Sequence, residues 1–353
     1  MKEYDLIIYG ASSFTAKHLI KQLENDKEHK IAVSSRNVKG IKTTFDKISC
    51  TVDKIKEITS KTKILINLAG PYTHTGEEII NACIETNTHY IDITGEVHFL
   101  KDIYEKYKDV NNIVIVQSCG FLSFTSDFFS SYFFKNFNCK IILSKSSSKI
   151  NKGTWLSLIE SLKHYNEHKK NKNNSNNLSK KPEFYIFSEY LKKYLVRSMG
   201  PDNYILKRSF NYFNNYSCVM YNTVDNFFIL LITSLVFFIL FLLSKYSATR
   251  ELLRKHYRIF SCNLVKDYKI DQFDETERFE MIFLDNKRIM KVNGPEGAYL
   301  STSIYLKILF NFLLESNIKG LYTPSVLLKD NKEEVVNQLL ENDFIITIQD
   351  YEK

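Results

Sequence analysis

The sequence predicts an α/β protein in which a doubly wound parallel sheet is followed by an inserted α+β domain that carries a hydrophobic helix. Short apolar segments alternate with segments of helical period through residues 4–117, this alternation stops at Cys139, and residues 227–243 contain no charge. Strands that alternate with short helices form parallel sheets with both faces covered. The 353 residues suffice for two domains of ordinary size.

The elements of the first domain follow from their periodicity. An apolar strand at 4–9 ends at Gly10, and apolar residues then recur at helical spacing from Phe14 to Asn25. The stretch between Arg36 and Val52 is short for a full helix and a third strand, so we expect that side of the sheet to be abbreviated. The remaining elements are strands at 31–33, 64–68, 89–93 and 113–117, and helices at 76–86 and 99–108.

The second domain begins with a strand at 139–149, a turn at 151–153 and a helix that opens near Thr154. Residues 166–181 contain eleven Asn or Lys among sixteen residues and no apolar period, which predicts a disordered insertion. The last section runs from the Asn-Gly-Pro-Glu-Gly motif at 293–297 through a helix at 302–315 to an amphipathic tail. The predicted division is 1–136 for the first domain, 137–292 for the second, and 293–353 for a segment that returns to the first.

Composition excludes several classes of protein. With 44% hydrophobic and 25% charged residues the chain is globular, neither wholly disordered nor a membrane protein of many spans. The net charge of +8 is too small to indicate nucleic acid, and only eight of the 48 cations are Arg. The six cysteines form no CxxC pair and no signal peptide opens the chain, so we expect a reducing compartment.

The apolar segment 227–243 indicates contact with a membrane. Its 17 residues reach ~25 Å as a helix, at the short limit for crossing a ~30 Å hydrocarbon core. Five basic residues follow it closely, which favours a cytosolic C-terminal side. A single span would separate two parts of the chain that should pack together, whereas in-plane or hairpin insertion keeps both flanks on one side. A buried core helix and an integral single-pass protein are the alternatives.

The turn between the first strand and the first helix predicts a dinucleotide site of the Rossmann type. Residues 10–16 open the helix where a pyrophosphate would bind free backbone N–H groups. Of the usual glycines only Gly10 remains, and Ser13 should crowd the pyrophosphate. The second strand ends at Ser35 and Arg36, where an NAD enzyme usually has an acidic residue, so we favour NADP over NAD. An ordinary solvated Arg is the alternative.

The carboxyl ends of two later strands supply the candidates for chemistry. Asp92 or Glu96 could act as acid or base, although Asp92 could equally serve as a cap or as a hydrogen-bond partner at the strand end. Tyr72 follows Gly70 and Pro71 at the same sheet edge. The catalytic residue therefore stays unknown, with Asp92, Glu96 and Tyr72 as candidates. The HxxEH pattern at 164–168 abuts the Asn/Lys tract and lacks a third ligand, so no metal site is expected.

Taken in order, these motifs resemble the saccharopine dehydrogenase-like oxidoreductases, the membrane- and lipid-droplet-associated relatives of saccharopine reductase and of the trans-acting enoyl reductases. The motifs are Gly10–Ala16, Ser35-Arg36, Ala69–Tyr72 with Gly76, Tyr90–Glu96, Ser118–Phe121, Gly153–Trp155 and Gly294–Tyr299. The chain departs from the family at Ser13 and Ala16, where glycine is usual, and at Leu122, where an acidic residue is usual.

The resemblance implies a nicotinamide cofactor held between two domains. Carried over by position, it assigns Gly10, Ser12, Ser13, Phe14 and Thr15 to the pyrophosphate and Arg36 to the adenosine phosphate. It assigns Gly70, Pro71 and Tyr72 to the nicotinamide ribose, and Gly120, Phe121, Gly153 and Thr154 to the cleft between the domains.

The expected function is hydride transfer by NADP to or from a lipid-like or amino-acid-derived substrate at a membrane or lipid-droplet surface. The alternative is a non-catalytic, membrane-attached Rossmann scaffold or redox sensor. The expected partners are that surface and a small-molecule substrate, without nucleic acid, and a homodimer is left open. The expected location is a cytosol-facing surface of a lipid droplet, the endoplasmic reticulum or the outer mitochondrial membrane.

Overall fold

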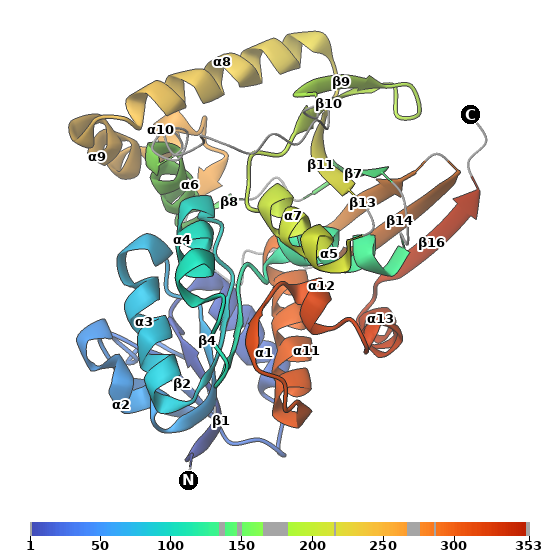
Figure 1. Ribbon diagram of the computed structural model, residues 1–353. Helices are drawn as coiled ribbons and strands as arrows, with labels where there is room; N and C mark the ends of the chain where they lie inside the picture. Colours follow the sequence, from blue (N-terminus) through green and yellow to red (C-terminus); the bar gives the residue numbers. More distant parts are fainter. Residues whose placement is uncertain are drawn as a thin grey trace.

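The computed structural model describes residues 2–133, 138–146, 150–164, 183–214, 217–266, 276–285 and 287–350. Two seven-stranded sheets and a two-stranded sheet organise these residues (Figure 1). The predicted insertion at 166–181 lies outside the described residues.

The first sheet is parallel throughout, as predicted, with strand order β15-β6-β5-β4-β1-β2-β3. Neighbouring residues Ile7 and Ile8 are fully buried in different apolar clusters, so helices cover both faces of the sheet. No helix lies between β2 and β3 in the described residues 36–45, in line with the predicted abbreviation. The strands are β1 (Tyr4–Tyr9), β2 (Ile31–Ser35), β3 (Asp46–Ser49), β4 (Thr62–Asn67), β5 (His89–Asp92), β6 (Val114–Val116) and β15 (Gly320–Tyr322).

Two helices around this sheet, Ile55–Thr59 and Phe121–Phe133, have no counterpart in the prediction, and the four others begin within about one turn of their predicted starts. One of them, α3, begins a turn earlier than the apolar period indicated, at Tyr72. The helices are α1 (Phe14–Leu23), α2 (Ile55–Thr59), α3 (Tyr72–Thr86), α4 (Val97–Tyr107), α5 (Phe121–Phe133) and α11 (Thr302–Glu315).

The second sheet is mixed, with strand order β16-β14-β13-β7-β11-β10-β9, and only β7 and β11 pair in parallel. Helices α5 and α7 (Asp202–Phe213) pack together beside it. The strands are β7 (Asn138–Lys145), β9 (Tyr185–Ser188), β10 (Lys193–Arg197), β11 (Ser217–Val224), β13 (Arg278–Leu284), β14 (Arg288–Pro295) and β16 (Ile345–Asp350).

The turn predicted at 151–153 is wrong. Residues Ile150–Asn151 form strand β8, which pairs with β12 (Val265–Lys266), and helix α6 (Lys152–His164) follows at once. Two short helices, α9 (Ser247–Lys255) and α10 (Tyr257–Phe260), precede β12.

The last part of the chain contributes to both sheets. Helix α11 packs against α1 and β15 pairs with β6, so these elements lie with the first sheet. Strand β16, by contrast, pairs with β14 at the edge of the second sheet. Helices α12 (Pro324–Leu327) and α13 (Lys332–Glu341) connect the two sheets.

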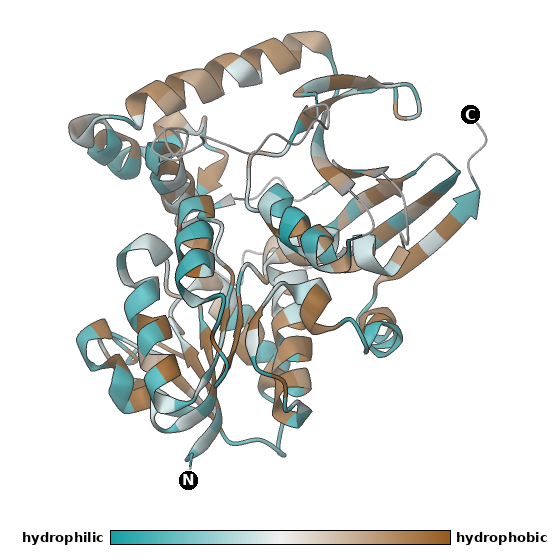
Figure 2. Ribbon diagram, in the orientation of Figure 1, coloured by the Kyte–Doolittle hydropathy of each residue, from teal (hydrophilic) through white to brown (hydrophobic). Residues whose placement is uncertain are grey.

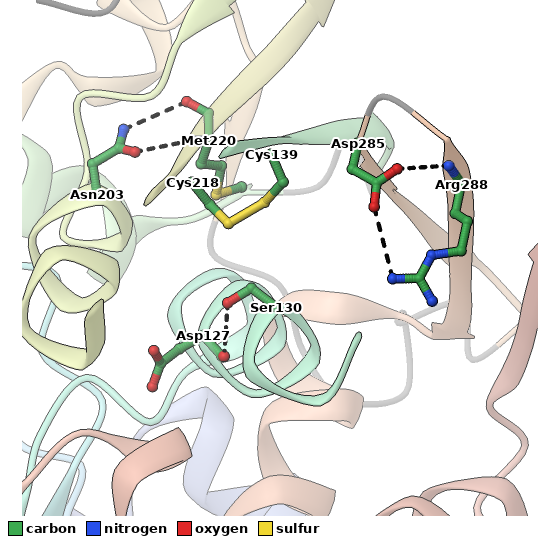
Figure 3. The surroundings of a disulfide bond; sticks show 8 residues. All are labelled: Asp127, Ser130, Cys139, Asn203, Cys218, Met220, Asp285 and Arg288. Atoms are coloured by element: carbon green, nitrogen blue, oxygen red, sulfur yellow. Dashed lines mark hydrogen bonds and ion pairs between the residues drawn. A yellow bond between two sulfur atoms is a disulfide. The ribbon is translucent and has the colours of Figure 1, made fainter. Parts of the chain in front are cut away.

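Cys139 and Cys218 form a disulfide, which the expectation of a reducing compartment did not include. They are 79 residues apart in sequence, but β7 and β11 are neighbours and place the two residues in register. Figure 3 shows the disulfide between these strands, beside α5 with Asp127 and Ser130. Spacing in sequence cannot predict a pair that only sheet topology brings together.

The apolar segment forms helix α8 over the predicted residues, Phe227–Leu243. It lies along the outside of the molecule, far from the N-terminus (Figure 1). With 17 residues, α8 is shorter than a candidate membrane span. Among the described residues one helical run, Gly297–Glu315, is long and apolar enough to cross a membrane by length and composition, but 67% of its most apolar stretch is buried. That run is therefore a core helix, and it contains α11.

Candidate functional site

The turn after β1 is built for close approach of the backbone. Gly10 adopts φ +79°, and a Cβ there would lie 2.6 Å from the carbonyl carbon of Leu68 and from the nitrogen of Ala69. A side chain at this position would therefore collide with the end of β4. Ala11 and Gly10 both donate their N–H groups to the Ser34 carbonyl, which ties the turn to β2.

Ser13 stabilises the helix that the turn opens. Its hydroxyl accepts the N–H of Ala16 at 3.2 Å, so it is the N-cap of α1, and its φ of −68° suits any residue. The Ser13 hydroxyl, which we expected to crowd the pyrophosphate, is thus bonded to the first turn of the helix. Thr15 and Ala16 are buried behind it. An N-cap of this kind satisfies one N–H and leaves others of the first turn for a ligand.

Polar side chains gather at the carboxyl end of β2. The hydroxyls of Ser12 and Ser35 lie 3.2 Å apart, and the exposed Arg36 follows directly. The charge of Arg36 also lowers the pKa of Tyr9, although burial raises that pKa overall. A guanidinium and two hydroxyls at this edge suit a phosphate ester.

The loop after β4 is fixed by a buried carboxylate. The peptide bond between Gly70 and Pro71 is cis, and Glu96 accepts the N–H groups of Tyr72 and Thr73 at 2.8 Å each. Glu96 also accepts the hydroxyl of Thr73. This carboxylate caps the first turn of α3, which explains why the helix begins at Tyr72.

The three candidate acid/base residues are all buried and internally bonded. Asp92 and Glu96 are fully buried, and the hydroxyl of the buried Tyr72 donates to the Asn67 carbonyl at 3.0 Å. Asp92 accepts the N–H groups of Thr94 at 3.0 Å and Ser118 at 2.9 Å. Burial raises the pKa of Asp92 to about 6 and that of Tyr72 well above its ordinary value. In this structure all three hold loops at the sheet edge in place.

Tyr299 joins the first domain to the second. Its ring lies edge-on to that of Phe14 with centroids 4.7 Å apart, and its hydroxyl accepts the N–H of Asn151 at 3.0 Å. It belongs to a π-helix, Gly297–Ser301, that contacts α1 and leads into α11. Glu296 caps that π-helix by accepting the N–H groups of its first residues.

The residues assigned to the interdomain cleft fall into two groups. Gly120 and Phe121 start α5, where Phe121 donates its N–H to the Thr302 hydroxyl at 3.0 Å. A Cβ on Gly297 would lie 2.4 Å from the Phe121 ring, so this contact requires glycine. These two residues therefore belong to the packed junction.

Gly153 and Thr154 form the second group and are exposed at the start of α6. The same helix faces the β4 loop, since a Cβ on Gly70 would lie 3.9 Å from the Ser157 hydroxyl. The start of α1, the Gly70 loop and the first turns of α6 thus border one region at the carboxyl edge of the parallel sheet, where α/β proteins bind ligands.

A chain of polar contacts between α3, α4 and α6 was not predicted from the sequence. The hydroxyl of Thr73 lies 2.6 Å from Nε2 of His98, whose ring stacks on His164 at 4.1 Å. His164 lies 3.4 Å from the buried Glu160, which also bonds Arg254 of α9 at 2.7 Å. The only signal for it was the HxxEH pattern, of which His164 alone is described.

These residues fit a nicotinamide dinucleotide. Gly10 provides a cradle that a Cβ would close, α1 presents its N-terminus to the pyrophosphate, and Arg36 can neutralise an adenosine phosphate. The residues that would hold the coenzyme are those that the sequence predicted around the β1 turn, the end of β2 and the Gly70 loop. Their role in binding stays a prediction.

Comparisons with known proteins show which proteins this chain is similar to. Residues 6–114 match the model of the saccharopine dehydrogenase NADP-binding domain. A saccharopine dehydrogenase-like oxidoreductase of Mus musculus is 25% identical over 407 residues, covering 94% of each chain. A lipid droplet localized protein of Caenorhabditis elegans is 25% identical over 191 residues, covering 45% of each chain, so this match spans less than half of that relative.

Apo saccharopine dehydrogenase (L-Glu forming) from Saccharomyces cerevisiae has the same fold. The TM-score is 0.54 at 12% identity, with 99% of this chain and 100% of that chain covered. The predicted resemblance and the Rossmann-type α/β fold are thereby confirmed. The match to an NADP-binding domain and the oxidoreductase relatives support NAD(P) binding and the expected oxidoreductase class. The same matches do not separate NADP from NAD.

Proposed function

We propose that this chain, a relative of the saccharopine dehydrogenase-like oxidoreductases, transfers hydride between NADP and a lipid-like or amino-acid-derived substrate at a membrane or lipid-droplet surface. The observation that carries the proposal is the convergence of the Gly10 turn, the Gly70 loop and the start of α6 at one sheet edge. Both domains border this region, so a coenzyme on the first would face a substrate on the second.

The residues at the end of β2 support NADP over NAD. No acidic residue occupies positions 34–37, where a ribose 2′-hydroxyl would need an acceptor. Arg36 is exposed there, and the Ser12 and Ser35 hydroxyls face one another beside it. A 2′-phosphate can accept hydrogen bonds from all three side chains.

The coenzyme supplies the hydride, and the chain's own residues bind and orient. Gly10 and the N-terminus of α1 hold the pyrophosphate, while Glu96 fixes the Gly70 loop through the backbone of Tyr72 and Thr73. On the substrate side, α6 places the hydroxyls of Thr154 and Ser157 at or near the carboxyl edge of the parallel sheet. No acid or base is assigned, because Asp92, Glu96 and Tyr72 are engaged inside the protein.

Helix α6 favours the lipid-like substrate over the amino-acid-derived one. Its start faces the Gly70 loop, while Trp155 and Ile159 pack in an apolar cluster with Leu240 of α8 and Leu253 of α9. The indole N–H of Trp155 donates to the Leu253 carbonyl at 3.0 Å. One helix therefore connects the coenzyme edge with the apolar helix, which suits a substrate delivered from a lipid phase.

Transfer of label from the coenzyme tests the proposal. The protein would be incubated with NADPH carrying deuterium at the transferable position and with a lipid extract, and products would be analysed by mass spectrometry. We expect deuterium in an apolar product. In a parallel incubation with an extract of polar metabolites, label in an amino-acid derivative would favour the other substrate class. Failure to transfer label despite tight NADPH binding would favour the non-catalytic scaffold or redox sensor.

A further inference from the structure

We propose that α8 and the β9–β10 hairpin form one lipid-inserting face, which lies flat in the headgroup region of a membrane or droplet and whose basic end binds anionic headgroups. The inference rests on the proposed function only for placing the protein at a lipid surface. It adds which surface inserts and in which orientation.

Helix α8 turns only a narrow stripe toward the protein. Leu230, Leu240 and the following Ser244 are buried, whereas the outward side chains are large, apolar and exposed, Ile232 by 62% and Phe228 by 76%. Figure 2 shows the helix as an almost continuous apolar rod on the surface. The exposed residues are Phe227, Phe228, Ile229, Leu231, Ile232, Leu235, Val236, Phe238, Ile239 and Leu242. A patch of this kind marks an interaction surface.

Both ends of α8 are fastened to the folded chain, so the helix cannot span a bilayer while it keeps its contacts. At its start the ring centroids of Phe227 and Tyr194 lie 6.1 Å apart, and near its middle the Ser234 and Tyr185 hydroxyls lie 3.2 Å apart. Toward its end Leu240 packs in the cluster of α6 and α9. The flanking elements also belong to one folded unit, which keeps them on the same side of a membrane.

The hairpin extends the apolar face beyond the helix. Phe184, Tyr185 and Phe187 are each more than two-fifths exposed. Between the hairpin and the first turns of α8 lies an apolar groove of about 360 Å³, lined by Ile186, Tyr194, Phe227, Leu230, Leu231 and neighbouring residues. Its lining includes the exposed side chains of Phe187, Phe227 and Leu231, so an acyl chain of the same lipid layer can reach it. Amphipathic phenol rings at this position suit the boundary between headgroups and chains.

Charge favours an anionic lipid surface as the occupant. The stretch from Ser244 to Cys262 contains five basic residues and one acidic residue, Glu251. Lys245 and Lys255 are exposed there, although Arg254 is engaged by Glu160 and Glu251. At the other end of α8, Lys193 is paired with Asp225. The surplus positive charge thus lies at one end of the apolar face, where it can meet headgroups.

Flotation with lipid vesicles tests this inference on the full chain. Vesicles of phosphatidylcholine alone and of phosphatidylcholine with phosphatidylserine would be mixed with wild-type protein, Ile232→Glu and the matched control Leu340→Glu. Leu340 is an equally apolar, 46% exposed residue on α13, outside the proposed face. NADPH binding in solution would be measured for each protein, because it reports folding and the coenzyme site independently of lipid.

We expect wild type and Leu340→Glu to float, more strongly with phosphatidylserine, and Ile232→Glu to lose at least tenfold in vesicle affinity while NADPH binding is unchanged. On vesicles, protease should reach both the first and the last part of the wild-type chain. The inference is overturned if Ile232→Glu floats like wild type, or if one end of the wild-type chain is protected from protease on vesicles. It is also overturned if the wild-type protein is a dimer that does not float and that Ile232→Glu dissociates into monomers. If the wild-type protein floats but does not bind NADPH, the proposed function is contradicted and the lipid-inserting face is not.

Discussion

The hydroxyl of Tyr299, in the π-helix before α11, accepts the backbone N–H of Asn151, in strand β8, at 3.0 Å. The ring that carries this hydroxyl also meets Phe14 at the start of α1. One buried side chain therefore links the predicted pyrophosphate turn, the strand before α6 and the π-helix before α11. The position of α6 relative to the coenzyme turn depends on it.

Tyr299→Phe should lower the free energy of unfolding by about 1–3 kcal/mol, because the N–H of Asn151 loses this acceptor in a buried place. It should also weaken NADPH binding, since α6 and α1 lose a common fixed point. Chemical denaturation and NADPH titration would measure the two effects. Tyr246→Phe, which removes a hydroxyl from an exposed ring, is the control and should change neither. Equal stability of the two variants would contradict the role of the contact.

Gly10→Ala should abolish measurable NADPH binding and lower the free energy of unfolding by at least about 1–2 kcal/mol. The positive φ is costly for alanine, and the added methyl would meet the backbone of Leu68 and Ala69. Gly40→Ala is the control, because no atom lies within 4 Å of a Cβ there. NADPH binding by Gly10→Ala at wild-type strength would show that the coenzyme does not use this turn.

Arg36→Ala should weaken NADPH binding roughly tenfold to hundredfold, the range expected for loss of a charged hydrogen bond, and should leave NADH binding nearly unchanged. Lys39→Ala removes the same charge from a nearby exposed position and controls for long-range attraction. Parallel titrations with both coenzymes give the ratio. Equal losses for NADPH and NADH would mean that Arg36 does not contact the 2′-phosphate.

The fully buried Asp127 should make stability depend on pH. Burial raises its pKa to about 6, so the folded protein keeps a proton that the unfolded chain loses near its ordinary pKa of 3.8. The stability that this retained proton gives to the folded protein is complete below about pH 4 and is lost as the pH rises through about 6.

Asp127→Asn cannot ionise, and its amide oxygen can still accept the Ser325 N–H at 2.8 Å. Relative to wild type it should therefore gain about 3 kcal/mol in the free energy of unfolding between about pH 4 and pH 7. Denaturation at both pH values measures this difference. Asp330→Asn, an exposed carboxylate, should show no such gain. A pH-independent difference for Asp127→Asn would contradict burial of a carboxylate with a raised pKa.

Periodicity predicted the first sheet well because its strands are short, apolar and separated by helices with one apolar face. The elements predicted at 4–9 and 227–243 have the predicted bounds, and the strand predicted at 89–93 ends one residue earlier, at Asp92. The start of α3 was placed too late because its cap, Glu96, comes from a loop 24 residues away. Apolar period carries no information about such a distant cap.

The candidate site was predictable in part for the same reason. Gly10 and Arg36 lie at strand ends, and strand ends can be located from local sequence. The structural tasks of Asp92 and Glu96, the disulfide of Cys139 with Cys218, and the His98–His164 stack depend on contacts between distant segments. Those contacts follow from topology, which short motifs do not encode.

The most direct measurement of the central claim is a fluorescence titration of the purified full chain with NADPH and, separately, with NADH. The account predicts saturable NADPH binding in the micromolar range, at least tenfold tighter than NADH binding and lost in Gly10→Ala. Absence of NADPH binding at millimolar concentration, with the protein folded, would contradict it.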